Sequence, residues 1–336
     1  MCVLIHTQDT NLFVVYATFG VMVADPKPEK KRAPRNRTIG ISAAERERFR
    51  SSLGRHAGGE IVNTLICGDS FNVLKSLPTV SFDLLFADPP YNLSKKFGNE
   101  EFRAVAADEY EIWLDSWLSL CVPVLKKTAS VYICGDWRSS SAIQRVGSRY
   151  FDLHNRITWE REKGRGAKAN WKNAAEDIWF FTVSDEYTFN TDAVKQRRRV
   201  LAPYTKDGNP KDWERSAAGN FRDTHPSNIW TDITVPFWSM PENTDHPTQK
   251  PEKLLAKILL ASTNEGDLVL DPFAGSGTTA VVAKKLDRNF VAVEADEEYC
   301  MLARKRLEMA EQDRAIQGFS DGVFWERNSS RPAMKP

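Results

Sequence analysis

The feature that most constrains this chain is an apolar segment that runs into a glycine-rich turn near its C-terminal end. The pattern predicts a buried strand over Asp267–Leu270, a turn over Asp271–Thr279 (DPFAGSGTT), and a helix that continues to Leu286. A second apolar strand, Phe290–Val293, ends at Glu294. Strand, tight turn, helix and strand in this order indicate a βαβ unit, and therefore a parallel sheet.

The glycine turn predicts a ligand site. Gly275 and Gly277 allow a tight turn and the close approach of a ligand to the backbone. Glu294 lies 17 residues beyond Gly277, where a carboxylate can accept hydrogen bonds from the two hydroxyls of a ribose. No lysine follows Gly277 as a P-loop requires, but the dinucleotide pattern G-x-G-x-x-A fits, so the turn alone leaves an NAD-dependent oxidoreductase open. Only 65 residues follow Asp271, however, whereas a Rossmann domain normally begins with this strand.

The remaining strands of the sheet must therefore come from earlier in the chain. Val62–Cys67, Phe82–Ala87 and Ala129–Cys134 are short apolar runs, and residues between them recur at helical spacing. This alternation stops at Phe151 and resumes after His246. We expect an α/β fold whose parallel sheet is covered by helices on both faces, interrupted by an insertion.

A second motif, Asp88–Pro–Pro–Tyr91, follows directly on the Phe82–Ala87 strand, at a carboxyl end where open α/β sheets bind their ligands. Pro89 and Pro90 fix their φ angles and have no N–H donor, so the turn is rigid and its carbonyls can accept. Asp88 and the Pro89 carbonyl can both accept hydrogen bonds from an exocyclic amine, and Tyr91 offers a ring for stacking. Because two acceptors stabilise the positive charge that grows on an attacking amine, the motif predicts methyl transfer to a nucleobase amino group.

Taken together, these motifs resemble those of the S-adenosylmethionine-dependent DNA amino-methyltransferases, in the permuted (beta) class whose catalytic motif precedes the cofactor motif. The resemblance covers about residues 61–308 and depends on Gly68–Asp69, Asp88–Tyr91, His246–Pro251, Asp271–Gly277 and Glu294, in the order of that class. It implies a doubly wound, mostly parallel seven-stranded methyltransferase sheet with a target-recognition insertion. It also implies S-adenosyl-L-methionine as the cofactor and double-stranded DNA as the substrate.

The resemblance assigns roles to individual residues. The catalytic set is Asp88, Pro89, Pro90 and Tyr91, and the cofactor-binding set is Asp69, Thr248, Lys250, Asp271, Phe273, Ala274, Gly275, Ser276, Gly277 and Glu294. Within the second set, Glu294 would hold the ribose hydroxyls and Asp69 would meet the adenine. Thr248 and Lys250, just before a helix, would receive the methionine carboxylate, and His246 is expected to be structural. No metal site is implied, because the five cysteines are far apart and form no CxxC pair.

Asp at position 88 favours adenine N6 as the target, since the cytosine-N4 enzymes of this family more often carry serine there. The expected activity is therefore an adenine-specific methyltransferase of a restriction-modification system, acting on a base flipped out of the duplex. Cytosine-N4 methylation is the main alternative. An RNA or protein methyltransferase is a weaker one, because the protein-amide enzymes usually carry Asn where this chain has Asp88. An NAD-dependent oxidoreductase would leave Asp88–Tyr91 without a role, and a non-catalytic DNA-binding module would tolerate Asp88→Ala.

DNA contact is expected from the insertion. Its stretch Arg156–Lys172 holds six basic and two acidic residues with interleaved tryptophans, and Lys195–Arg199 is a second basic cluster. The DNA-binding candidates are Arg161, Lys163, Arg165, Lys168, Lys172, Arg197 and Arg198. A solvated charged surface is the simpler interpretation of the same clusters. The recognition sequence, a homodimer and a cognate restriction endonuclease acting on the same site are left open.

The predicted organisation has four parts. These are an N-terminal arm that is partly disordered (1–58), a catalytic and cofactor-binding domain (59–150 and 246–315), a target-recognition region (151–245) and a C-terminal tail (316–336). A net charge of +1 and 41% hydrophobic residues in 336 exclude a largely disordered chain and a uniformly basic one.

The longest apolar stretch, Asn11–Ala24, is shorter than the ~20 residues that a membrane span needs. No membrane association is therefore expected, and the widely spaced cysteines favour the reducing cytoplasm. Met22 opens a polar, basic segment typical of a protein start, so we expect residues 1–21 to be a translated upstream region.

Overall fold

The computed structural model describes residues 33–53, 61–97, 100–102, 104–161, 169–201, 204–207, 209–216 and 219–327. From Arg37 onward these residues belong to one compact unit. The apolar stretch Asn11–Ala24, Met22 and the DNA-binding candidates Lys163, Arg165 and Lys168 lie outside the described residues. Within the described ranges, no helix is long and apolar enough to cross a membrane.

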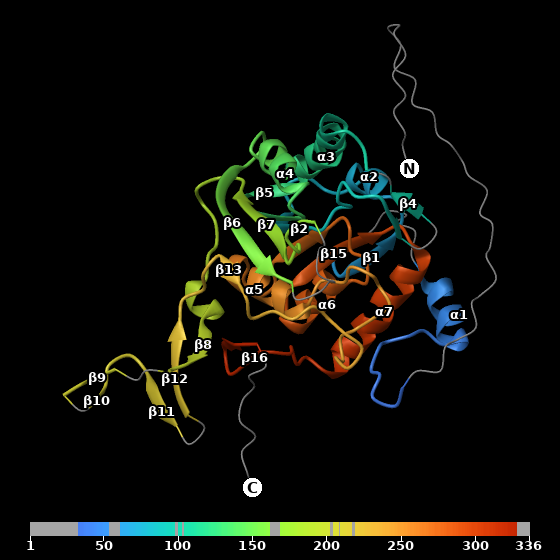
Figure 1. Ribbon diagram of the computed structural model, residues 1–336. Coiled ribbons are helices and arrows are strands. Elements are labelled where there is room, and N and C mark those ends of the chain that lie inside the picture. Colours follow the sequence, from blue (N-terminus) through green and yellow to red (C-terminus); the bar gives the residue numbers. More distant parts are fainter. Residues whose placement is uncertain are drawn as a thin grey trace, which may run out of the picture. The chain divides into compact units, whose positions relative to one another are not determined.

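A central sheet of eight strands organises the molecule (Figure 1). In spatial order its strands are β1 (Thr64–Cys67), β15 (Asn289–Glu294), β14 (Leu268–Asp271), β2 (Phe82–Ala87), β5 (Leu125–Gly135), β7 (Ala175–Thr182), β6 (Asp152–Glu160) and β13 (Ile229–Trp230). All neighbouring pairs are parallel except the two that β7 makes with β5 and β6. The expected doubly wound, mostly parallel sheet is confirmed, and the short β13 adds one strand to the seven expected.

The spatial order brings the two chemical motifs together. β14, from the C-terminal third, pairs with β2, from the N-terminal third, in the register Val269↔Leu84 and Leu270↔Leu85. Because the two strands are parallel, their carboxyl ends lie at the same edge of the sheet. Asp271 and Asp88 therefore begin adjacent loops, although they are far apart in the sequence.

Helices cover both faces of the sheet (Figure 1). One face carries α2 (Ser70–Leu74), α3 (Ala107–Cys121) and α4 (Ser140–Gly147), and the other carries α5 (Glu252–Ser262), α6 (Thr278–Lys285) and α7 (Glu297–Gln312). Successive side chains of a strand point to opposite faces, so Leu84 and Phe86 of β2 pack against the second group of helices, whereas Leu85 and Ala87 pack against the first. The result is two apolar cores separated by the sheet.

Smaller elements complete the fold. A five-stranded sheet has the order β11 (Glu214–Ser216), β12 (Gly219–Thr224), β8 (Gln196–Arg199), β17 (Val323–Trp325) and β16 (Phe319–Ser320). Two hairpins are formed by β3 (Lys95–Phe97) with β4 (Glu100–Phe102) and by β9 (Thr205–Lys206) with β10 (Asn209–Pro210). Short 3-10 helices span η1 (Val122–Val124) and η2 (Thr191–Val194).

The structure has elements that the expected division of the chain did not include, in three places. The first is the N-terminal arm, where residues 43–52 form the helix α1 (Ala43–Ser52). Ser42 and Glu45 make a capping box at its start, and Lys305 of α7 donates to Glu45 and to the Gly40 carbonyl, at 3.0 and 2.7 Å. A capped helix held by a neighbouring helix is an ordered element of the fold.

The second difference is the C-terminal tail, part of which forms β16 and β17. Val323, Phe324 and Trp325 are buried, and β17 pairs with β8. The hairpin turns at Asp321 and Gly322, both with positive φ, which a two-residue hairpin loop requires. The third difference is the insertion, whose strands β6 and β7 extend the central sheet instead of forming a separate surface.

Candidate active site

The glycine loop joins β14 to α6 and has the conformation that its sequence predicts. Gly275 and Gly277 have φ angles of 55° and 75°, in the left-handed region that favours glycine. A Cβ on Gly277 would lie 2.5 Å from the Cβ of Ala303, and one on Gly275 would lie 2.9 Å from Nε2 of His246. The loop is therefore closely surrounded by α7 and by the segment before α5, and a structural role for His246 stays a prediction.

Glu294 turns its carboxylate toward this loop. Its Oε2 accepts a hydrogen bond from the Gly275 N–H (2.7 Å) and its Oε1 accepts one from the Asp296 N–H (2.8 Å). Each carboxylate oxygen can accept a second bond. Burial raises the pKa of Glu294 to about 7, although the backbone donors oppose the shift. The position fits an acceptor for ribose hydroxyls at the end of β15.

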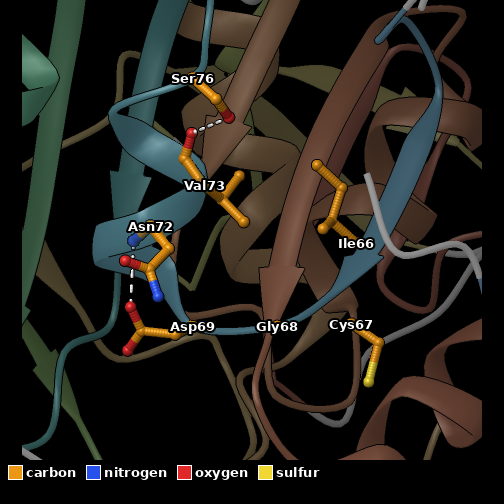
Figure 2. Close-up of a pocket in the computed structure, with 7 residues that line it drawn as sticks. All are labelled: Ile66, Cys67, Gly68, Asp69, Asn72, Val73 and Ser76. Carbon is orange, nitrogen blue, oxygen red and sulfur yellow. Dashed lines mark hydrogen bonds between the residues drawn. The ribbon is translucent and has the colours of Figure 1, made fainter. Parts of the chain in front are cut away.

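The turn after β1 lies beside Glu294. The Gly68 N–H donates to the Glu294 carbonyl (2.8 Å), and Asp69 Oδ1 accepts from the Asn72 N–H (3.0 Å), which caps α2. Figure 2 shows the open pocket here, lined by Ile66, Cys67, Gly68, Asp69, Asn72, Val73 and Ser76. Asp69 thus lies at the same sheet edge as Glu294, where the resemblance places it, and it also has a capping task.

Buried polar residues hold the glycine loop in place. Asp271, 3% exposed, accepts from the Phe273 N–H (3.0 Å), and burial raises the pKa of its carboxyl to about 7. Arg306 of α7 donates to the Ser276 carbonyl (2.9 Å) and to Glu252 Oε1 (3.0 Å). The motifs gave no indication of Arg306, because its partners are distant in the sequence.

Phe273 connects the loop to the opposite face of the sheet. Its ring lies edge-on to Trp117 of α3, with centroids 5.0 Å apart, and 6.2 Å from the ring of Trp113. The remaining members of the predicted loop set, Ala274 and Ser276, are buried.

The catalytic motif follows β2 and is held by tyrosine hydroxyls. The Tyr91 hydroxyl donates to Asp88 Oδ1 (2.8 Å), and the Tyr110 hydroxyl donates to the Pro90 carbonyl (3.0 Å). Burial, together with the charges of Asp88 and Glu176, raises the pKa of Tyr91 well above its ordinary value. Tyr91 therefore stays protonated and fixes the orientation of the Asp88 carboxylate. The Pro89 carbonyl, one peptide further, completes the predicted pair of acceptors.

Lys250 reaches this motif rather than the glycine loop. Its Nζ donates to Asp88 Oδ2 (2.5 Å) and to the Tyr91 hydroxyl (3.2 Å), and lies 3.5 Å from Glu176 Oε2. The backbone carbonyl of Lys250 accepts from Thr278 at the start of α6 (3.0 Å), so the residue links the two loops. The resemblance implies a contact of Lys250 with the methionine carboxylate, and in the structure the ammonium group has carboxylate partners of the protein instead. Thr248 lies in the same turn, where its N–H donates to His246 Nδ1 (3.4 Å).

The described DNA-binding candidates are mostly engaged within the protein. Arg161 forms an ion pair with the buried Glu176. Arg197 pairs with Asp223 through two contacts of 2.7 Å, and Arg198 donates to Gln196 (3.1 Å). Lys172 is exposed. A contact of these residues with DNA stays a prediction.

Comparison with known proteins agrees with the geometry of the site. Residues 82–305 match the model of a family described as DNA methylase. The chain is 37% identical over 260 residues to the DNA adenine methyltransferase YhdJ of Escherichia coli (strain K12), covering 75% of this chain and 85% of that protein. It is 34% identical over 247 residues to the Type II methyltransferase M.HpaI of Haemophilus parainfluenzae, covering 73% and 74%.

Solved structures share the fold. The PvuII DNA methyltransferase, named as cytosine-N4-specific, superposes with a TM-score of 0.54 at 21% identity, over 74% of this chain and 90% of that one. The M1.HpyAVI–SAM complex gives a TM-score of 0.50 at 24% identity, over 73% and 98%. The match over residues 82–305 includes both the Asp88–Tyr91 motif and the glycine loop. The expected resemblance is confirmed, and this chain belongs to the DNA methylase family.

Proposed function

We propose that this protein is a site-specific DNA methyltransferase that moves the methyl group of S-adenosyl-L-methionine to N6 of an adenine in a short duplex sequence. The observation that carries the proposal is the adjacency of two loops. Asp88–Tyr91 extends from β2 and the glycine loop from β14, and these strands are hydrogen-bonded neighbours. An amine held by the first loop and a cofactor held by the second would therefore meet at one sheet edge.

The residues at this edge fit the cofactor. The glycine loop follows β14 and the Glu294 carboxylate ends the neighbouring strand β15, where it accepts a hydrogen bond from the Gly275 N–H. Gly275 and Gly277 would lie against the adenosyl group, and Glu294 would accept from the ribose hydroxyls. When bound, S-adenosyl-L-methionine supplies an electrophilic methyl group on a sulfonium.

The protein's part in the reaction is to make a weak nucleophile reactive. The lone pair of an adenine amine is delocalised into the ring. Acceptors at Asp88 and the Pro89 carbonyl would bind its hydrogens, localise that lone pair on N6 and stabilise the growing positive charge. Extrusion of the base costs a few kcal/mol in lost pairing and stacking, which the Tyr91 ring would offset in part.

Adenine is favoured over cytosine by two observations. Position 88 carries Asp, and YhdJ, at 37% identity, is named an adenine enzyme. The cytosine-N4 enzyme among the solved structures is 21% identical, a level at which the likeness concerns the fold alone. The proposal also includes a cognate endonuclease, which the Type II name of M.HpaI suggests. It further includes a homodimer and a cytoplasmic location. Target recognition is proposed for the part of residues 151–245 outside β6 and β7.

The direct test supplies tritiated S-adenosyl-L-methionine and unmethylated duplex DNA, followed by digestion to nucleosides. Labelled N6-methyldeoxyadenosine is the expected product. Labelled N4-methyldeoxycytidine would keep the mechanism and change the base, and absence of label from DNA would contradict the proposal.

The catalytic role of Asp88 is tested by Asp88→Ala. We expect turnover to fall at least about a hundredfold while cofactor binding persists, because an acceptor of developing charge is lost. Asp185→Ala, at an exposed position, is the matched control and should leave turnover unchanged. Turnover of Asp88→Ala within a few-fold of wild type would remove Asp88 from the reaction.

A further inference from the structure

Lys250 lies between two carboxylates, only one of which has a role in the reaction described above. Its side chain is 6% exposed, and those of Asp88 and Glu176 are 17% and 3% exposed. Nζ is 2.5 Å from Asp88 Oδ2 and 3.5 Å from Glu176 Oε2. Burial lowers the pKa of Lys250, but the charges of Asp88 and Glu176 outweigh it and hold that pKa above its ordinary value. The lysine is therefore a buried cation that stays charged.

In this arrangement the cation opposes the chemistry proposed for Asp88. Oδ1 accepts from Tyr91 and Oδ2 accepts from Lys250, so each oxygen of the acceptor binds one donor and has one acceptor site left for the amine. A positive charge beside Oδ2 repels the positive charge that grows on the target amine during attack, and repulsion is strong where water is excluded. Methyl transfer would be faster with the ammonium group away from Asp88.

Glu176 offers a second place for the ammonium group. Its Oε1 accepts from Arg161, whereas Oε2 is buried and accepts no hydrogen bond from the part of the chain that the structure describes. A charge-assisted hydrogen bond needs about 2.8 Å, so a shift of roughly 0.7 Å would bring Nζ within bonding distance of Oε2. The same shift would lengthen the contact of Nζ with Asp88 Oδ2 from 2.5 Å to at most about 3.2 Å, which weakens that contact without breaking it. Two carboxylates and two cations, Lys250 and Arg161, make up the group, and its net charge is the same before and after the shift.

We propose that Glu176 is a positioning residue for methyl transfer, which draws Lys250 away from Asp88 when the target amine enters and so lowers the positive charge felt at Asp88 Oδ2. The inference depends on the proposed function. Glu176 is the second residue of β7, and its ion-pair partner Arg161 is one of the residues predicted to contact DNA. The position of Lys250 is thereby linked to the part of the chain expected to meet DNA.

The test compares Glu176→Gln with wild type in single-turnover methylation of duplex DNA at saturating cofactor. Glutamine keeps the size of the side chain and removes the charge that attracts Lys250. We expect the methylation rate to fall about tenfold or more, while the Kd for S-adenosyl-L-methionine by calorimetry changes by less than about twofold. Glu160→Gln, on the neighbouring strand β6 with a half-exposed side chain, is the control and should match wild type.

The decisive variant is Glu176→Gln combined with Lys250→Met. If Glu176 acts through Lys250, adding Glu176→Gln to the Lys250→Met protein should slow methylation by less than about twofold, because no lysine cation remains to be moved. A structural role of Glu176 would instead lower the melting temperature and slow methylation equally in both backgrounds. Glu176→Asp, which keeps the charge, should recover part of the rate.

Three results would overturn the inference. The first is a Glu176→Gln rate within about twofold of wild type, and the second is an equal loss in the two backgrounds. The third is a Lys250→Met variant that binds cofactor about tenfold more weakly yet methylates at the wild-type rate when saturated, since Lys250 would then serve the cofactor. Wild-type enzyme that labels no DNA would refute the proposed function itself, and this inference with it.

Discussion

Gly277 is the position in the cofactor loop where the cost of a substitution can be worked out from the structure. With φ at 75°, an alanine there would pay about 1–2 kcal/mol for a left-handed backbone. Its Cβ would also lie 2.5 Å from the Cβ and 3.2 Å from the Cα of Ala303. Overpacking of this kind costs about 1–3 kcal/mol, because α6 or α7 has to move. The two costs give an expected loss of about 2–5 kcal/mol in the free energy of unfolding for Gly277→Ala.

Gly266→Ala separates the two costs. Gly266 has φ at 84°, but no described atom lies within 4 Å of its Cβ position, so this variant should lose only the backbone cost of about 1–2 kcal/mol. Urea unfolding of both variants measures the difference, expected at about 1–3 kcal/mol. Ala303→Gly should cost about 1 kcal/mol alone yet recover stability in the Gly277→Ala protein. Equal destabilisation by Gly277→Ala and Gly266→Ala would refute the proposed clash with Ala303.

Three further outcomes follow from the site. Glu294 has a pKa of about 7 in the free protein, and only its carboxylate accepts from both ribose hydroxyls. Cofactor affinity should therefore fall toward tenfold per pH unit below about pH 7 and level off above it, whereas Glu294→Gln should bind weakly at every pH, as calorimetry can measure. Arg306→Met removes one of two cations that pair with the buried Glu252, the other being Lys285 at 2.7 Å, and it also removes the Arg306 hydrogen bond to the Ser276 carbonyl. The variant should therefore cost about 1–3 kcal/mol in urea unfolding, with the exposed Arg304→Met as the near-neutral control. Trp137 is 60% exposed and lies just beyond β5, at the sheet edge that carries Asp88, so its ring should stack on DNA. Trp137→Ala should weaken DNA binding about tenfold in fluorescence anisotropy, whereas Ile112→Ala on α3 should leave it unchanged.

The central strands and both chemical loops could be predicted because their signals are local. An apolar run that ends in Asp88–Pro–Pro–Tyr91 determines its own strand and turn, and one that ends in the glycine turn determines a strand, a turn and a helix, and the structure has each of these elements. Two missed elements also carried local signals. Ser42 and Glu45 have the spacing of a capping box, and Asp321–Gly322 is a dipeptide typical of a two-residue hairpin turn.

The strands of the insertion could not be placed from their own sequence. The run Ile178–Phe181 is apolar enough to be a strand, but its pairing partner is β5, in the register Ile133↔Trp179. Nothing in either segment specifies this pairing, since hydrophobic strands of similar length occur throughout the chain. Sheet membership is decided by how the two cores close, and hence by contacts between residues far apart in the sequence.

The partners of the basic residues were the least predictable part of the site, and the reason is electrostatic. The family resemblance implies a contact of Lys250 with the cofactor carboxylate, and the basic composition of residues 156–172 predicts a contact of Arg161 with DNA. In the fold, the buried Glu176 and the half-buried Asp88 lie within reach of these cations, and a buried carboxylate without a partner costs far more than an exposed phosphate contact contributes. Burial therefore decides the pairing before any ligand arrives. A DNA or cofactor group that needs Lys250 or Arg161 has to compete with Asp88 and Glu176. Because these two carboxylates hold the cations in the free protein, the release of Lys250 and Arg161 has to be controlled there.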